Sequence, residues 1–345
     1  MKLFLWVFIC LCTLAWGQGG KSTFSNPLLS SGPDPWVEYK DGFYYYMNST
    51  QTNLTVWKTR NIADLRSAEK KIVWNPPASG PYSHDIWAPE IHFLRGKWYI
   101  YFAADAGKNA SHRIWVVENS SSDPLTGEWT FKGKVSDASD KWAIDASVFE
   151  DRGKLYMIWS GWEGDENMAQ NIYIARMKNP WTIESRRTLL SKPEFPWEKV
   201  GDIPDYEKSD NPPHVDVNEG PEILKHGDKL FLIYSASGCW TDSYALGMLS
   251  TTSGSDLLDA RSWKKSSHPV FQQNPDAHAF SPGHNSFFKS SDGKQDWIIY
   301  HANPAPGQGC GEHRSPRAQP LTWNSDGSPN FGMPVGVGVE IPRPQ

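Results

Sequence analysis

The chain has 345 residues, with 39 acidic against 34 basic side chains and a formal net charge of −5. Aromatic residues are plentiful, at 18 Trp, 15 Phe and 13 Tyr. This composition is typical of a large aromatic-rich β domain and excludes a disordered chain or a long-helix protein. Because no basic stripe is present, neither nucleic acid nor an anionic membrane is an expected partner. A neutral polymer such as a polysaccharide fits better.

The first 17 residues have the pattern of a secretory signal peptide. Lys2 is followed by an apolar run from Leu3 to Ala15 and then by small residues around Gly17. The run is too short to span a bilayer, so we interpret residues 1–17 as a removable signal rather than a membrane anchor. The sequence therefore predicts a secreted, extracellular protein with one folded domain over residues 24–342, which we expect to be a monomer.

Cysteines and glycosylation sequons agree with export. Cleavage of the signal leaves Cys239 and Cys310, and two cysteines in an oxidising compartment are expected to form a disulfide. N-x-S/T sequons, which permit N-glycosylation of a secreted protein, begin at four asparagines: Asn48, Asn53, Asn109 and Asn119.

Five segments of the chain share one plan, an apolar strand, a glycine turn and an aromatic-rich strand. Their corresponding starts are 55 to 74 residues apart and lie at Asp34, Glu90, Asp145, Glu219 and His284. Units of this length, with three or four strands each, are typical of propeller blades. The sequence therefore predicts an all-β protein, a single-domain five-bladed β-propeller. An open sandwich of unrelated hairpins is the alternative, which five matching units disfavour.

The propeller has a chemical consequence for the acidic residues. The innermost strand of each blade lines the central channel, so Asp34, Asp145 and Glu219 are expected to meet at one end of it. Glycoside hydrolysis needs one protonated and one ionised carboxyl group, and a third carboxylate nearby helps to keep the acid protonated. The plain alternative is that these acids cap turns or pair with basic side chains. Their repeated placement favours a glycosidase.

Five short motifs, one in each repeat, carry a resemblance to a known family. They are Gly32-Pro33-Asp34-Pro35, Trp87-Ala88-Pro89-Glu90, Ile144-Asp145-Ala146-Ser147, Glu219-Gly220-Pro221 and Gly283-His284-Asn285. In this order and at this spacing, they make residues 26–342 resemble glycoside hydrolase family 43, whose members are five-bladed propellers that hydrolyse with inversion.

The resemblance implies a role for each carboxyl group. Asp34 matches the general base, Asp145 the carboxylate that tunes the pKa of the acid and orients it, and Glu219 the general acid. Inverting geometry predicts that the carboxyl groups of Asp34 and Glu219 are roughly 6.5–9.5 Å apart, which leaves room for a water molecule.

Four further residues are implicated through the same resemblance. His284 matches a histidine near the propeller axis that binds a metal ion, often calcium, directly or through water; a hydrogen-bonded buried imidazole is the alternative. Arg314, or Arg317 close to it, matches an arginine that reaches the sugar or the catalytic carboxylates. Trp87 is a candidate sugar-facing aromatic. The chemistry itself is expected to require no cofactor.

Two other acids stand near these motifs. Glu222 is three residues after Glu219, and an odd offset on an extended strand points to the opposite face. Glu90 begins the second repeat without an assigned catalytic role.

The sugar is indicated by resemblance alone. Segments 237–240, 309–311 and 314–320 look most like the exo-acting α-L-arabinofuranosidases of the family, which release L-arabinofuranose from arabinan or arabinoxylan. Endo-1,5-α-L-arabinanase and β-xylosidase are alternatives, because the catalytic trio is common to all three. A non-catalytic carbohydrate-binding propeller is disfavoured, since no member of the trio is lost.

Overall fold

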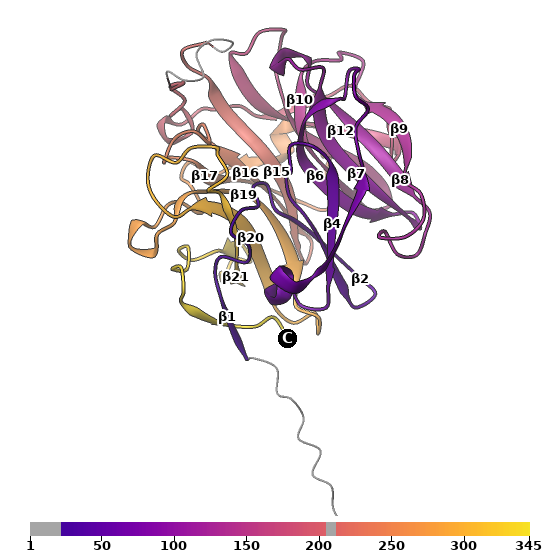
Figure 1. The fold of residues 1–345 in the computed structure, drawn as a ribbon. Coiled ribbons are helices and arrows are strands. Elements are labelled where there is room, and N and C mark those ends of the chain that lie inside the picture. The colour runs from indigo at the N-terminus through magenta and orange to yellow at the C-terminus, as the bar shows by residue number, and fades with distance from the viewer. Residues whose placement is uncertain (1–21, 205–211) are drawn as a thin grey trace, which may run out of the picture.

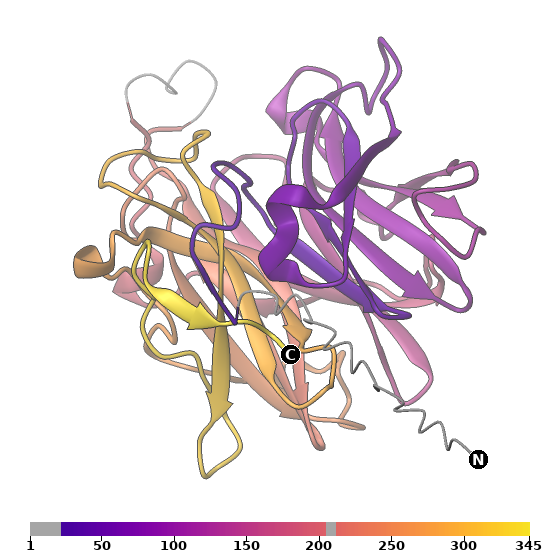
Figure 2. The same cartoon turned by 60° about the horizontal axis from the view of Figure 1, so that its bottom comes forward.

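The computed structural model describes residues 22–204 and 212–345, which form five antiparallel sheets around a central axis (Figure 1). The predicted signal peptide, residues 1–17, lies outside the described residues. Within the described part, no helix is long and apolar enough to cross a membrane. Figure 2 shows the blades of the N-terminal half on one side of the axis and those of the C-terminal half on the other.

Each blade begins with its inner strand and proceeds outward. The strands of blades 1 and 2 are β2 (Trp36–Lys40), β3 (Phe43–Met47), β4 (Leu54–Thr59), β5 (Glu69–Trp74), β6 (His84–Leu94), β7 (Lys97–Asp105), β8 (Arg113–Asn119) and β9 (Thr130–Val135). Those of blade 3 are β10 (Ala143–Asp151), β11 (Lys154–Gly161), β12 (Ala169–Asn179), β13 (Thr182–Ile183) and β14 (Thr188–Ser191).

The last two blades repeat the plan. Their strands are β15 (Asp216–His226), β16 (Lys229–Ala236), β17 (Ala245–Thr252), β18 (Lys264–Lys265), β19 (Phe280–Lys289), β20 (Asp296–Asn303), β21 (Ser315–Trp323) and β22 (Pro329–Asn330). A two-residue parallel pairing of β12 with β15 joins blades 3 and 4. The described helices are short 3₁₀ turns: η1 (Ile62–Ser67), η2 (Asn109–Ser111), η3 (Pro196–Glu198), η5 (Ala260–Ser262) and η6 (Pro275–Ala277). The prediction of an all-β propeller is confirmed.

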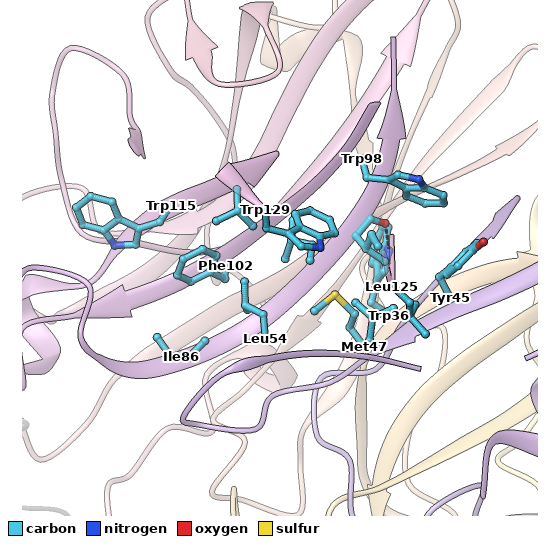
Figure 3. Close-up of a cluster of buried hydrophobic side chains, with 14 of the residues drawn as sticks. Trp36, Tyr45, Met47, Leu54, Ile86, Trp98, Phe102, Trp115, Leu125 and Trp129 are labelled. Atoms are coloured by element: carbon cyan, nitrogen blue, oxygen red, sulfur yellow. Dashed lines mark hydrogen bonds between the residues drawn. The ribbon is translucent and has the colours of Figure 1, made fainter. Parts of the chain in front are cut away.

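Aromatic side chains fill the space between neighbouring blades. Between blades 1 and 2, the rings of Trp36, Tyr45 and Trp98 pack into one buried cluster with Phe102 (Figure 3). The Trp36 indole also donates a hydrogen bond to the carbonyl of Ile91 across the blade interface, at 2.7 Å. Large rings suit this position because twisted sheets packed face to face leave a layer about 10 Å thick to fill. The high aromatic content is therefore explained by blade packing.

The two ends of the described chain close the propeller together. Strand β1 (Thr23–Ser25) pairs antiparallel with β23 (Glu340–Pro342), next to blade 5. Beyond β1, the buried Asn26 amide donates to the carbonyl of Ala318 and accepts from its N–H, both at 2.9 Å. Asn26 therefore satisfies both the N–H and the carbonyl of Ala318 in β21, and it connects the N-terminal segment to the last blade.

The inner strands of blades 2 to 5 share a β-bulge at the same place. The pairing register shifts between residues 87 and 90, 144 and 147, 219 and 222, and 283 and 286. The first residue inside each bulge has a positive φ, as does the residue two before β2: Ala88 (42°), Asp145 (56°), Gly220 (54°), His284 (45°) and Asp34 (57°). Left-handed backbone at non-glycine residues is costly and gathers at functional sites.

The bulges correct the predicted correspondence of the five blade starts. Asp34, Asp145 and His284 do share the left-handed conformation, but Glu219 precedes its bulge by one residue and Glu90 follows Ala88 by two. The expectation that all five residues are equivalent was therefore wrong for the two glutamates. The reason is physical, because a bulge changes the direction of successive side chains and sequence spacing alone does not show where it lies.

A second group of acids is buried inside the propeller. Glu90 Oε2 lies 3.0 Å from Nε2 of His92, and the Ser147 hydroxyl donates to Glu222 Oε2 at 2.8 Å. Burial, together with the nearby Glu222, raises the pKa of Glu90 well above its usual range. Burial also raises the pKa of Glu222 to about 8 and lowers that of His92 to about 3. Burial therefore favours the protonated Glu90 carboxyl, which can donate to the neutral imidazole of His92.

Replacing Asn26 should weaken closure of the propeller. Asn26→Ala leaves a buried N–H and a buried carbonyl of Ala318 without their partner, at about 1–3 kcal/mol each. We expect the free energy of unfolding, measured with urea, to fall by about 2–4 kcal/mol. Asn324→Ala, in an exposed turn, should change it by less than about 0.5 kcal/mol. Equal effects of the two substitutions would contradict this role.

Glu90 should make stability depend on pH. Its pKa is raised in the folded state, so its stabilisation is complete below the unfolded value near 4.3 and is lost as the pH rises toward the folded value. Glu90→Gln keeps an N–H donor for His92 but does not ionise. Between pH 5 and 9, its free energy of unfolding should fall less than that of the wild type, by about 1–2 kcal/mol. The exposed Glu128→Gln should follow the wild-type curve; a parallel curve for Glu90→Gln would exclude this origin.

Candidate active site

A pocket of about 370 Å³ opens at one end of the channel. Side chains from every blade line it, because the inner strands converge there. Six of the seven predicted site residues are among them: Asp34, Trp87, Asp145, Glu219, His284 and Arg314. The structure therefore brings the three predicted carboxyl groups together in one place.

Asp34 is held by four neighbours. Its Oδ2 accepts a hydrogen bond from Ser49 at 2.5 Å, and its Oδ1 lies 3.1 Å from Nη1 of Arg314 and 3.4 Å from Nδ1 of His284. Its backbone N–H donates to His301 Nδ1 at 3.1 Å. Burial by itself raises the pKa of Asp34, but these neighbours outweigh it and hold the pKa well below its usual range. The Asp34 carboxyl is therefore ionised.

The two imidazoles beside Asp34 are neutral. Burial lowers the pKa of His284 and, more strongly, that of His301, and the guanidinium of Arg314 adds to both shifts. The positive charge that balances Asp34 consequently resides on Arg314. This is the residue type best suited to a buried ion pair, because its charge is permanent.

Asp145 and Glu219 lie in a different electrostatic environment. The Tyr244 hydroxyl donates to Glu219 Oε1 at 2.7 Å, and the Gly220 N–H donates to Asp145 Oδ2 at 3.0 Å. Burial raises the pKa of Glu219 to about 7, opposed by the Tyr244 hydrogen bond and supported by the charge of Asp34. Burial and the charge of Glu219 raise the pKa of Asp145 well above its usual range. The pair therefore retains a proton near neutral pH, next to an ionised Asp34.

Two glycines of the motifs make room for this arrangement. A Cβ at Gly283 would lie 2.2 Å from the ring of Tyr244, which is the ring that reaches Glu219. A Cβ at Gly220 would lie 3.1 Å from Nδ1 of His284, at a position that also has a positive φ. Any larger side chain would push one of these partners out of place.

Three residues that contact the carboxyl groups were not predicted. They are Ser49, Tyr244 and His301, which lie in blades 1, 4 and 5 outside the motifs. Each contact joins residues from different strands or blades, and no spacing along the chain indicates it.

Arg314 and Arg317 have different positions. Arg314 lies just before β21, where its guanidinium reaches the pocket and Asp34. Arg317 lies within β21, opposite Tyr300, and its side chain is completely buried. Arg317 is not among the residues that line the pocket, so its predicted role in substrate binding is wrong. Three residues of extended strand carry it away from the pocket.

Glu222 also lies apart from Glu219. Its carboxyl accepts from Ser147 of blade 3 and belongs to the second group of buried acids, while Glu219 lines the pocket. This agrees with the expectation from the odd offset.

Three tryptophans, Trp87, Trp142 and Trp240, line the pocket. Trp87 stacks on His112, with ring centroids 4.0 Å apart, and its indole N–H donates to Gln51 at 2.7 Å. Trp240 lies next to Cys239, whose predicted disulfide with Cys310 is present and also lines the pocket. Flat apolar faces of this kind are suited to the hydrophobic side of a sugar ring.

A metal ion bound by the protein would need several ligating side chains close together. The described residues contain no group of three or more His, Cys, Asp or Glu side chains arranged to hold one. His284 faces Asp34, whose Oδ1 is already paired with the cationic Arg314. A calcium ion beside His284 stays a prediction, and water would have to supply most of its oxygen ligands.

Comparison with known proteins agrees with this geometry. The family model of glycosyl hydrolases family 43 matches residues 24–329. A protein of Streptomyces avermitilis named extracellular exo-α-(1→5)-L-arabinofuranosidase is 38% identical, over 98% of this chain and 71% of its own length. One of the same name from Streptomyces chartreusis is 36% identical, over 81% of this chain and 82% of its own length.

Solved structures agree as well. The crystal structure of an α-L-arabinofuranosidase from Lactobacillus brevis superimposes with a TM-score of 0.82 at 36% identity, covering 92% of this chain and 98% of that one. The family match, over residues 24–329, includes every residue that lines the pocket. The chain therefore belongs to glycoside hydrolase family 43.

Proposed function

We propose that the protein is a secreted, inverting exo-α-L-arabinofuranosidase that releases L-arabinofuranose from arabinan or arabinoxylan. The observation that carries the proposal is one pocket that holds an ionised carboxylate, Asp34, opposite a carboxyl pair that retains a proton. The names of the two Streptomyces relatives support the sugar and the exo action. Their description as extracellular supports secretion.

Each carboxyl group has a step in the proposed reaction. Asp34 takes a proton from a water molecule while the oxygen of that water attacks the anomeric carbon. Glu219 gives its proton to the departing glycosidic oxygen as the carbon–oxygen bond breaks. Because the attack and the departure occur on opposite faces, the anomeric configuration inverts. The two carboxyl groups then return to their starting states by exchanging protons with solvent.

Arg314 acts on Asp34, and Asp145 acts on Glu219. Arg314 keeps Asp34 ionised, as a general base requires. Asp145 accepts from the Gly220 N–H, next to Glu219 in the chain, and thereby holds the backbone that carries the acid. The negative charge that opposes ionisation of Glu219 is that of Asp34.

The size of the pocket favours a chain end over a threaded polymer. At about 370 Å³ it is at the small end of ligand pockets, and its walls include bulky Trp87 and Trp240. Incubation with linear arabinan tests this directly. Arabinose alone as the first product supports exo action, whereas early oligomers indicate endo action. Release of xylose from arabinoxylan would contradict the proposal that arabinose is the sugar released. The anomer first formed, read by NMR, tests inversion.

Substitution of the proposed acid and base should separate their roles. Glu219→Gln should lower kcat on arabinan about 10²–10⁴-fold, but far less on a dinitrophenyl arabinofuranoside, whose leaving group needs no proton. Asp34→Asn should lower kcat on both substrates, because both need an activated water. The exposed Asp165→Asn is the control. Equal losses for Glu219→Gln on both substrates would contradict its role as the acid.

The pH dependence of kcat/KM should follow the pKa values of Glu219 and Asp34. Activity should decline as the pH rises through about 7, where Glu219 loses its proton, while the acidic limb lies at low pH because the pKa of Asp34 is depressed. Arg314→Ala removes the cation and should move the acidic limb upward by about one pH unit or more. Arg314→Lys should move it less. An unchanged acidic limb in both variants would exclude this role of Arg314.

A further inference from the structure

Two loops from neighbouring blades meet at the edge of the pocket. The first, residues 237–244, joins β16 to β17 in blade 4, and the second, residues 304–314, joins β20 to β21 in blade 5. The Cys239–Cys310 disulfide links them, with the two Cα atoms 5.2 Å apart. Hydrogen bonds also link the two loops: the N–H of Gly307 donates to the two oxygens of the Asp242 carboxylate, at 2.9 and 3.2 Å.

The second loop has a composition that resists ordering. It contains no strand or helix, and three of its residues are glycines: Gly307, Gly309 and Gly311. Most of the loop is exposed, but Gly309, whose carbonyl accepts from Asn303 at 2.9 Å, and the final residue Arg314 are buried. Glycine loses more conformational freedom on folding than any other residue, so a covalent restraint has a large effect on such a segment.

The disulfide is one peptide unit away from a group that orients Arg314. The carbonyl of Gly311, next to Cys310, accepts hydrogen bonds from the Arg314 backbone N–H at 3.4 Å and from its Nε at 3.3 Å. Nη1 of the same guanidinium lies 3.1 Å from Asp34 Oδ1. A short path of contacts therefore runs from the disulfide through the Gly311 carbonyl and Arg314 to the proposed base.

The geometry points to the disulfide as a positioning element of the active site. We propose that the Cys239–Cys310 bond fixes the loop of residues 304–314 so that Arg314 stays on Asp34, and that its loss weakens the reaction while the propeller remains folded. The inference rests on the proposed function. Asp34 itself has further partners in Ser49 and His301, so it is the guanidinium rather than the carboxylate that is expected to move.

Four proteins test the proposal: the wild type, Cys239→Ser/Cys310→Ser, Arg314→Ala and the triple variant. The measurement is kcat/KM on an aryl arabinofuranoside across pH, at a temperature where near-UV circular dichroism shows each protein folded. Loss of the disulfide should lower kcat/KM about 10- to 100-fold, as expected for displacement of a positioning group by about 1 Å. The acidic limb should move toward that of Arg314→Ala.

The triple variant separates positioning from general stability. If the disulfide acts through Arg314, removing it in the Arg314→Ala background should change kcat/KM by less than about twofold, because residues on one path are not additive. Losses that multiply, or an unchanged acidic limb without the disulfide, would overturn the inference. Should the serine pair unfold, Cys239→Ala/Cys310→Val replaces the sulfur atoms with apolar groups and permits the same comparison.

A control addresses the other tie between the loops. Asp242→Asn weakens the contact with Gly307 but leaves the disulfide intact, and kcat/KM should stay within about threefold of the wild type. A wild-type enzyme that releases no arabinose would refute the proposed function and this inference with it. An active wild type whose activity does not depend on the disulfide would refute the inference alone.

Discussion

Three carboxyl groups share one buried pocket with a single guanidinium, and one cation cannot keep three neighbouring carboxylates ionised. Arg314 is in direct contact with Asp34, so Asp34 is the group that carries the charge. Asp145 and Glu219 receive no comparable partner, and burial, together with the charge of Glu219 on Asp145 and of Asp34 on Glu219, keeps a proton between them. The proposed division into base and acid thus depends on where the one cation is placed.

The backbone that holds these groups is under strain. Asp34, Asp145 and His284 all have left-handed conformations, which are unfavourable for residues with a side chain. At Gly220 and Gly283 the absence of a side chain relieves crowding instead, so that His284 and Tyr244 can approach. Left-handed backbone and the absence of two side chains thus both shape the site.

The channel holds two groups of acids with different consequences. Around Asp34 the pocket provides a cation and is open to substrate, whereas Glu90 and Glu222 are hydrogen-bonded to His92 and Ser147. Because burial favours the neutral form of both acids, the second group contributes hydrogen bonds to the interior with little cost of a buried charge. One type of side chain thus serves chemistry in one place and stability in the other.

The repeat of strand, glycine turn and aromatic strand was sufficient to predict the propeller, since hairpins and blades are local patterns with a long period. The same repeat indicated Asp34, Asp145 and Glu219, which the pocket brings together. Tertiary structure decided the positions of individual side chains. The bulges displaced Glu90 and Glu219 from the predicted correspondence, and β21 directed Arg314 into the pocket but buried Arg317. Ser49, Tyr244 and His301 reach the carboxyl groups across strands or blades. Sequence determines periodicity and residue type, whereas contacts between distant strands, and hence the pKa of each acid, exist only once the blades have packed.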